Sequence, residues 1–167
     1  MRILATLLAV VPGLLHAQTC APWNVADAYL RAEASGSLYT PAIGTLFFRT
    51  VDLPIAGGQD QPDATRIRAL FTGNAVADFR EPQNHTSGQY RRSIGGHITL
   101  EVECFGSACG APLPGEVIVF LHGAPGQVGY TLTTSPCGDD LFIASQVNVA
   151  QLLECVTGGP CAPSVVD

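Results

Sequence analysis

Residues 97–137, HITLEVECFGSACGAPLPGEVIVFLHGAPGQVGYTLTTSPC, decide the fold class of this chain. In the first part, apolar side chains alternate with mostly polar ones, at Ile98, Leu100, Val102 and Cys104. This alternation is typical of a strand with one buried face. Residues 117–121 are all apolar, and so short a run favours a strand covered on both faces, because a helix needs about ten residues or more. Residues 130–134 alternate again, so the stretch predicts a mainly β protein.

Outside this stretch, three further segments are expected to be strands. Residues 43–51 are rich in β-favouring types, and residues 66–72 alternate in polarity. In the second segment Ile67, Ala69 and Phe71 lie opposite Arg66, Arg68 and Leu70. Residues 74–80 either form its hairpin partner or continue it. Residues 141–144 predict a last short strand, and together the strands indicate a small β barrel or sandwich.

Two short helices are expected beside the sheet, one N-terminal and one C-terminal. Asn24 can cap the first, with Asp27 three residues later, and small polar residues end it near Ser35. Its apolar stripe consists of Val25, Ala28, Tyr29 and Ala32. Asn148 is expected to cap the second helix, which the Gly-Gly-Pro sequence at 158–160 ends. The stripe of this helix consists of Val149, Leu152, Leu153 and Val156.

Two polar segments are expected to be loops. Residues 56–64 combine Gly, Asp, Gln and Pro, and residues 81–96 are the least hydrophobic part of residues 18–167. Long loops often carry binding surfaces, so the second segment is a candidate binding loop. Its side chains of interest are Asn84, His85, Tyr90, Arg91 and Arg92. Asn84, His85 and Thr86 also form a glycosylation sequon.

The N-terminus reads as a cleavable export signal at residues 1–17. Arg2 supplies a positive charge, residues 3–15 form an apolar run, and Ala17 is a small residue at the cleavage position. Pro12 and Gly13 interrupt the run, which is also too short for a membrane anchor. A lipid-modified Cys20 is an alternative, although the preceding residues lack the small residue expected there. We therefore expect a secreted or periplasmic protein with a single β domain at residues 18–167.

The six cysteines are expected to form three disulfides, because an even number in an exported chain indicates a disulfide framework. Short gaps with glycine between them favour pairing Cys104 with Cys109 and Cys155 with Cys161. By elimination, Cys20 would pair with Cys137. Six cysteines allow fifteen pairings, so this connectivity is a hypothesis.

The charge of the chain argues against nucleic acid and anionic membranes as partners. The net charge is −6, and no lysine is present among the eight basic residues. Both kinds of partner bind proteins through clustered positive charge, and the densest basic spot here is the Arg91-Arg92 pair. A protein or another cell-surface molecule is the expected partner.

The chemistry-bearing residues do not form a catalytic or metal-binding motif. His122 follows a strand as in the oxyanion region of α/β-hydrolases, but no G-x-S-x-G elbow and no further histidine follow it. His85, His97 and His122 lack the spacing of metal ligands, and the cysteine gaps favour disulfides over zinc. We therefore expect no cofactor and no metal.

Several features together resemble the netrin-like, or tissue-inhibitor-of-metalloproteinases-like, module. Cys20 lies close behind the export signal and before the short helix, and residues 108–137 contain the sequences ACG, PGEVIVF and LTTSPC. The best match covers residues 108–137, with weaker agreement at residues 20–34. The resemblance implies an OB-type five-stranded barrel with helices packed against it, tied by disulfides from the N-terminal segment.

The N-terminus departs from the inhibitors of that family. Those inhibitors begin with Cys-x-Cys, and the amine of the first residue binds the catalytic zinc of the target. After the expected cleavage this chain begins Gln18-Thr19-Cys20, with a single cysteine and a glutamine that can cyclise. The resemblance therefore does not carry inhibition by that route.

The sequence favours a non-catalytic binding module outside the cytoplasm, with an inhibitor as one form of it. One alternative is a small secreted hydrolase that uses His122, His97 and the carboxylates of Glu101 and Glu103, which would share one face of a strand. Another alternative is a structural component of the cell envelope.

Overall fold

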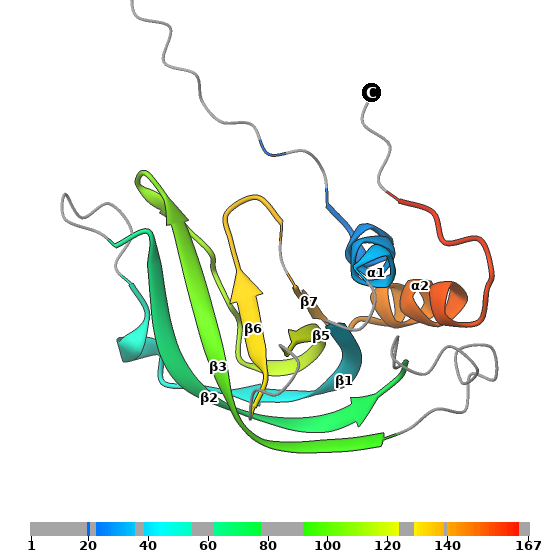
Figure 1. Ribbon diagram of the computed structural model, residues 1–167, viewed down its shortest axis with the longest axis horizontal. Coiled ribbons are helices and arrows are strands. Elements are labelled where there is room, and N and C mark those ends of the chain that lie inside the picture. The colour runs from blue at the N-terminus through cyan, green and yellow to red at the C-terminus, as the bar shows by residue number, and fades with distance from the viewer. Residues whose placement is uncertain are drawn as a thin grey trace, which may run out of the picture.

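A computed structural model describes residues 20, 23–35, 39–54, 62–77, 92–123, 129–138 and 140–163. The expected fold class is confirmed, because the described residues form a mainly β protein with a closed barrel and two helices (Figure 1). The elements, in chain order, are α1 (Val25–Ala34), β1 (Tyr39–Phe47), the 3-10 turn η1 (Thr50–Asp52), β2 (Ala64–Ala75), β3 (Arg92–Phe105), β4 (Ala108–Cys109), β5 (Gly115–His122), β6 (Thr131–Thr134), β7 (Leu141–Ile143) and α2 (Gln146–Val156).

The barrel consists of β1, β2, β3, β6 and β5 in this spatial order, and pairing of β5 with β1 closes it. The β3–β6 pair is parallel and the others are antiparallel. Two short strands complete the sheet: β4 forms a hairpin with the end of β3, and β7 pairs with residues 117–119 of β5, on the same edge of β5 that pairs with β6 at His122. Closure removes the unpaired strand edges that an open sheet of these strands would expose.

Strand β5 is buried on both faces, as its uninterrupted apolar run predicts. Val117, Val119 and Leu121 point into the barrel core. Ile118 and Phe120 point outward and belong to a second core formed with the two helices. All five side chains are at most 1% exposed. Full burial of one such side chain contributes about 1.5–3 kcal/mol, so β5 joins the two halves of the hydrophobic interior.

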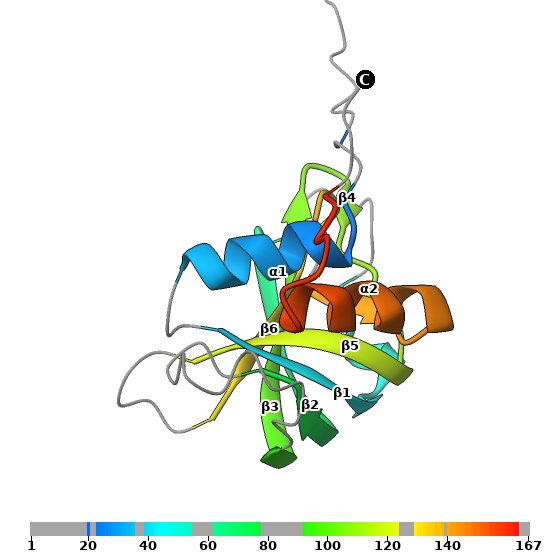
Figure 2. The ribbon, with the colours of Figure 1, turned by 90° about the vertical axis from the view of Figure 1, so that its right-hand side faces the viewer.

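The helices lie side by side over β5 and β1 (Figure 2). The expected start of α1 is confirmed: Asn24 and Asp27 form a reciprocal capping box, and Ser35 follows the last turn. Its expected stripe is buried in the second core. The expected cap of α2 is wrong, because Ser145 caps this helix and accepts a hydrogen bond from the backbone N–H of Asn148. The amide of Asn148 instead donates to the carbonyl of Ile143, the last residue of β7.

The first strand lies earlier in the chain than expected. It begins at Tyr39 rather than residue 43, because its first residues pair with the end of β5. It also ends at Phe47, and residues 50–52 form the η1 turn in place of strand. Strand β2 shows that residues 74–75 continue the strand, one of the two alternatives left open.

Strand β3 corrects the expected loop at residues 81–96. It begins at Arg92, because β2 is long enough for Ala75 to pair with Arg92. Arg92 is therefore an exposed strand residue. Asn84, His85, Tyr90 and Arg91 lie outside the described residues, as do residues 55–61 of the other expected loop.

The three disulfides join the expected pairs, Cys20 with Cys137, Cys104 with Cys109, and Cys155 with Cys161. The second closes the β3–β4 hairpin, and the third ties the end of α2 to the chain that follows it. The first spans a sequence separation of 117 residues. In the chain-entropy model a crosslink over such a loop stabilises the fold by on the order of 4–5 kcal/mol.

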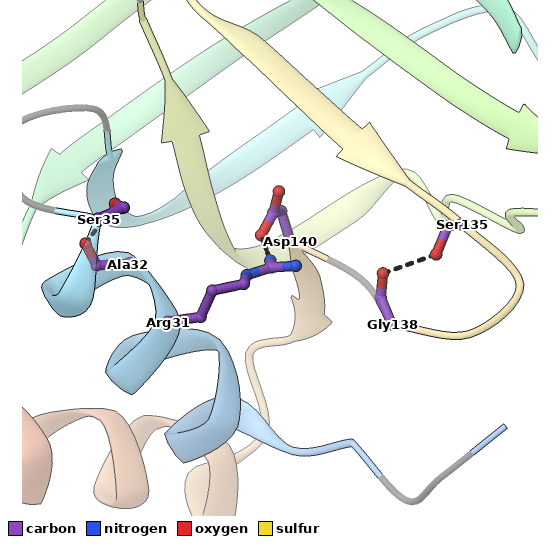
Figure 3. Close-up of polar contacts among 6 residues, drawn as sticks. All are labelled: Arg31, Ala32, Ser35, Ser135, Gly138 and Asp140. Carbon is purple, nitrogen blue, oxygen red and sulfur yellow. Dashed lines mark hydrogen bonds and ion pairs between the residues drawn. The ribbon is translucent and has the colours of Figure 1, made fainter.

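The same N-terminal segment is held by an ion pair. The guanidinium of Arg31 on α1 reaches Asp140, just before β7, as Figure 3 shows. The Asp140 side chain is only 6% exposed, so the ion pair is nearly buried on its acidic side. Arg31 also lies over the ring of Trp23, and Trp23 packs against Gly138. These contacts, with the Cys20–Cys137 bond, form what we call the N-terminal clamp.

Two glycines allow β1 and β2 to approach closely inside the barrel. Gly44 pairs directly with Gly73. A Cβ atom at Gly44 would lie 2.3 Å from the carbonyl oxygen of Thr72, and one at Gly73 would lie 2.3 Å from that of Ile43. No relaxation of a side chain relieves a collision with backbone, so these positions favour glycine.

We expect Gly44→Ala to destabilise the protein by about 1–3 kcal/mol or more, because the added methyl group overpacks the barrel. Gly95→Ala is the matched control, since a Cβ at Gly95 meets no atom within 4 Å. Denaturant unfolding with the disulfides intact measures both. Equal stability of the two variants would contradict the close strand crossing.

We expect Arg31→Met to destabilise the protein by about 1–3 kcal/mol, because it leaves a nearly buried carboxylate without its guanidinium. Asp140→Asn in the Arg31→Met background should recover part of the loss. A double-mutant cycle on the free energy of unfolding measures this coupling. Additive single losses would show that the pair contributes nothing to the clamp.

Candidate functional site

The two described histidines do not form a pair. His97 lies exposed on β3, and His122 is the last residue of β5. His122 pairs with Thr131, and Thr131 pairs with Thr99, two residues beyond His97. Two strand spacings and two residues thus separate the histidines, which places their backbones on the order of 10 Å apart.

One carboxylate of the hydrolase alternative, that of Glu101, is engaged by a neighbouring strand. Glu101 and Glu103 share the outer face of β3, as expected, since Leu100 and Val102 between and beside them point into the core. The Glu101 carboxylate accepts a hydrogen bond from the guanidinium of Arg66 at 3.0 Å. The described residues therefore do not assemble the histidines and glutamates into one acid–base site.

His122 instead adjoins the N-terminal clamp. Its ring lies 5.1 Å from that of Tyr39, and the guanidinium of Arg31 lies 5.8 Å from the Tyr39 ring. Burial and the nearby Asp140 carboxylate raise the pKa of Tyr39, while Arg31 acts in the opposite direction. The effects of burial and of Asp140 both favour the neutral phenol of Tyr39 beside the Arg31–Asp140 ion pair. This arrangement explains the cluster as a support for α1, and the sequence offered no sign of it because Arg31 and Asp140 are 109 residues apart.

The outer face of β2 and β3 is a second and more accessible grouping. The helices cover β5 and β1, whereas β2 and β3 sweep around the other side of the barrel (Figures 1 and 2). Strand pairing sets Phe47, Leu70 and His97 directly opposite one another in one row. Phe47 is 55% and Leu70 40% exposed, and His97 is exposed as well. We call Phe47, Leu70 and His97 the apolar row.

The next row along the strands is polar. It consists of Arg68, Thr99 and Thr131 on β2, β3 and β6. A third row contains the Arg66–Glu101 ion pair. The surface therefore changes from aromatic and aliphatic to cationic and hydroxylated within two residues along β2.

Two hollows lie on this face. The first, of about 640 Å³, is lined by residues of β2, of β3 and of the segment that begins β6: Arg66, Ile67, Arg68, His97, Ile98, Thr99, Gly129, Tyr130 and Thr131. The second, of about 450 Å³, lies between the η1 turn and β2: Phe47, Phe48, Arg49, Asp52, Arg68, Ala69, Leu70 and His97. Arg68 and His97 line both, so the hollows adjoin at these two side chains.

Only some of the basic side chains on this face form ion pairs. Arg66 is held by Glu101, and Arg49 lies 3.9 Å from Asp52 in an exposed contact. Within the part of the chain that the structure describes, neither Arg68 nor His97 has an ion-pair partner. Arg68 is therefore the guanidinium best placed to meet a group from outside.

Sequence reasoning found only part of this surface. The outward positions of Arg66, Arg68 and Leu70 and the outer face of β3 follow from period-two alternation, and both are confirmed. Phe47 was not singled out, because its place beside Leu70 depends on strand register. The local signal for this surface is Leu70, an apolar residue on the same face of the strand as Arg66 and Arg68.

Among the described residues, no group of three His, Cys, Asp or Glu side chains is arranged to hold a metal ion. Neither described helix is long and apolar enough to cross a membrane. Comparisons with protein-family models, curated proteins and solved structures found no match to this chain. The function must therefore be argued from the site.

Proposed function

We propose that this protein is an exported, non-catalytic binding module that engages its partner through the outer face of β2 and β3. The observation that carries the proposal is the apolar row, in which strand pairing sets Phe47 and Leu70 side by side in contact with water. Exposed apolar groups gathered beside hollows, with polar groups around them, are typical of interaction surfaces.

The rest of the molecule suits such a role. A closed barrel, two capped helices and three disulfides hold the β2–β3 face in one shape. A binding surface that is already ordered loses less conformational entropy when its partner arrives. The only neutralised buried carboxylate described, Asp140, belongs to the clamp and lies away from this face.

We also propose that the chain is a netrin-like module. A five-stranded barrel, helices packed against it and a disulfide from the N-terminal segment to residue 137 support this assignment. The proposed binding role does not use the inhibitory route of metalloproteinase inhibitors, because the chain has one cysteine near its N-terminus where they have two.

Export is part of the proposal. Three disulfides are typical of proteins that fold in an oxidising compartment, such as the extracellular space or the periplasm. The apolar run at residues 3–15 behind Arg2 supports delivery there by a signal peptide.

We expect the exported product to begin at Gln18, in open or cyclised form. Intact-mass measurement and N-terminal peptide mapping of protein recovered outside the cytoplasm check this. Alanine at position 17 replaced by a bulky residue, as in Ala17→Phe, should slow cleavage, because signal cleavage needs a small residue there. A product that retains residues 1–17 would contradict the signal peptide.

We expect a photo-crosslinking residue to capture a defined partner from position 70 but not from position 147. Leu70 and Val147 are both exposed apolar positions, Val147 being on α2 and 77% exposed, so the second is a matched control. Crosslinking in native exported fractions, with p-benzoylphenylalanine at each position, measures the difference. Adding Arg68→Glu should abolish the product from position 70. Equal capture from both positions, or none from position 70, would overturn the proposed surface.

A further inference from the structure

The two hollows differ in chemistry but share a boundary. Arg68 and Leu70 project from the same face of β2, because residues two apart on a strand point the same way. Two residues along a strand span about 6.6–6.8 Å. Arg68 lines both hollows, whereas Leu70 lines only the second, more apolar one. The guanidinium and this apolar side chain therefore extend from Cα atoms that are one such repeat apart.

An extended polypeptide has the same repeat. If such a segment lies along β2, its side chains at alternate positions face the barrel and meet Arg68 and Leu70 in turn. The spacing therefore matches a partner whose recognised groups are two residues apart in an extended chain.

The first hollow, which Arg66, Arg68 and His97 line, favours a carboxylate; we call it the cationic hollow. Arg68 has no ion-pair partner among the described residues, and His97 lies beside it. A guanidinium can donate two parallel hydrogen bonds to a carboxylate, and the hydroxyl groups of Thr99 and Thr131 border the same row. The chain as a whole carries a charge of −6, so the positive charge of this hollow has the opposite sign to that of the molecule and favours acidic groups there.

The second hollow favours an aliphatic or aromatic side chain. Phe47 and Leu70 are exposed there, and the partly buried Phe48 lies beneath them. Covering these groups removes apolar surface from water, which favours binding.

Resting on the proposed function, we propose that the partner presents an extended segment with an acidic residue and an apolar residue at alternate positions. The acidic side chain binds at Arg68 and His97, and the apolar one covers Phe47 and Leu70. Protein rather than carbohydrate is the partner, because an extended polypeptide places a carboxylate and an aliphatic side chain one strand repeat apart, whereas an acidic sugar carries the carboxylate without the aliphatic side chain.

The test uses capped peptides and the full oxidised protein. The probe is Ser-Gly-Asp-Ser-Leu-Gly-Ser, compared with its Asn analogue and with the order-swapped Ser-Gly-Asp-Leu-Ser-Gly-Ser. We expect the probe to bind about tenfold more tightly than either comparison peptide, measured by NMR chemical-shift titration. The largest shifts should fall on the amides around residues 68–70 and 97–99.

Variants of exposed residues then assign the two groups. Arg68→Gln should remove the preference for Asp over Asn, and Arg68→Glu should bind a Lys-Ser-Leu peptide in preference to the Asp-Ser-Leu probe. Leu70→Ser should remove the preference for Leu over Ser in the peptide. Val147→Ser, on α2, should leave every affinity unchanged, and unaltered near-UV circular dichroism controls for folding.

Three results would overturn the proposal: no difference between the two peptide registers, an Asp preference that survives Arg68→Gln, or preferential binding of an acidic oligosaccharide such as a heparin hexasaccharide at the same residues. If the peptides fail while partner capture from position 70 persists, the acidic-and-apolar segment is wrong and the binding function stands. If both fail, the surface itself is wrong.

Discussion

The burial of β5 on both faces is the constraint on which the rest of the structure depends. Val117, Val119 and Leu121 fill the barrel, so Ile118 and Phe120 must find cover on its outside. Two short helices can supply that cover on only one side of a five-stranded ring. The opposite side, formed by β2 and β3, is left in contact with water, and its composition is then open to a role in binding.

The parts of this fold that the sequence predicts are those set by local pattern. The apolar run at residues 117–121 is double-sided because no polar residue interrupts it, and Asn24 with Asp27 marks a helix start through hydrogen bonds that span three residues. Disulfide pairing also followed from proximity in sequence, since two of the three bonds close loops with separations of 5 and 6 residues.

What the sequence did not predict is set by contacts between distant segments. Tyr39 belongs to a strand because β5 pairs with it, although Pro41, two residues later, is of a type that strand interiors disfavour. Asp140 is buried because Arg31 arrives from α1. The same holds for the candidate site, since neither Phe47 nor His97 carries a local sign of the other and only the β1–β2 and β2–β3 registers bring both to Leu70.

The N-terminal clamp connects stability with the proposed role. It fixes α1 through a covalent bond at Cys137 and an ion pair at Asp140, both in the segment that joins β6 to β7. Strand β6 pairs with β3 and carries Thr131 of the polar row. The clamp and the proposed binding face are therefore parts of one continuous sheet, connected by the pairing of β6 with β3.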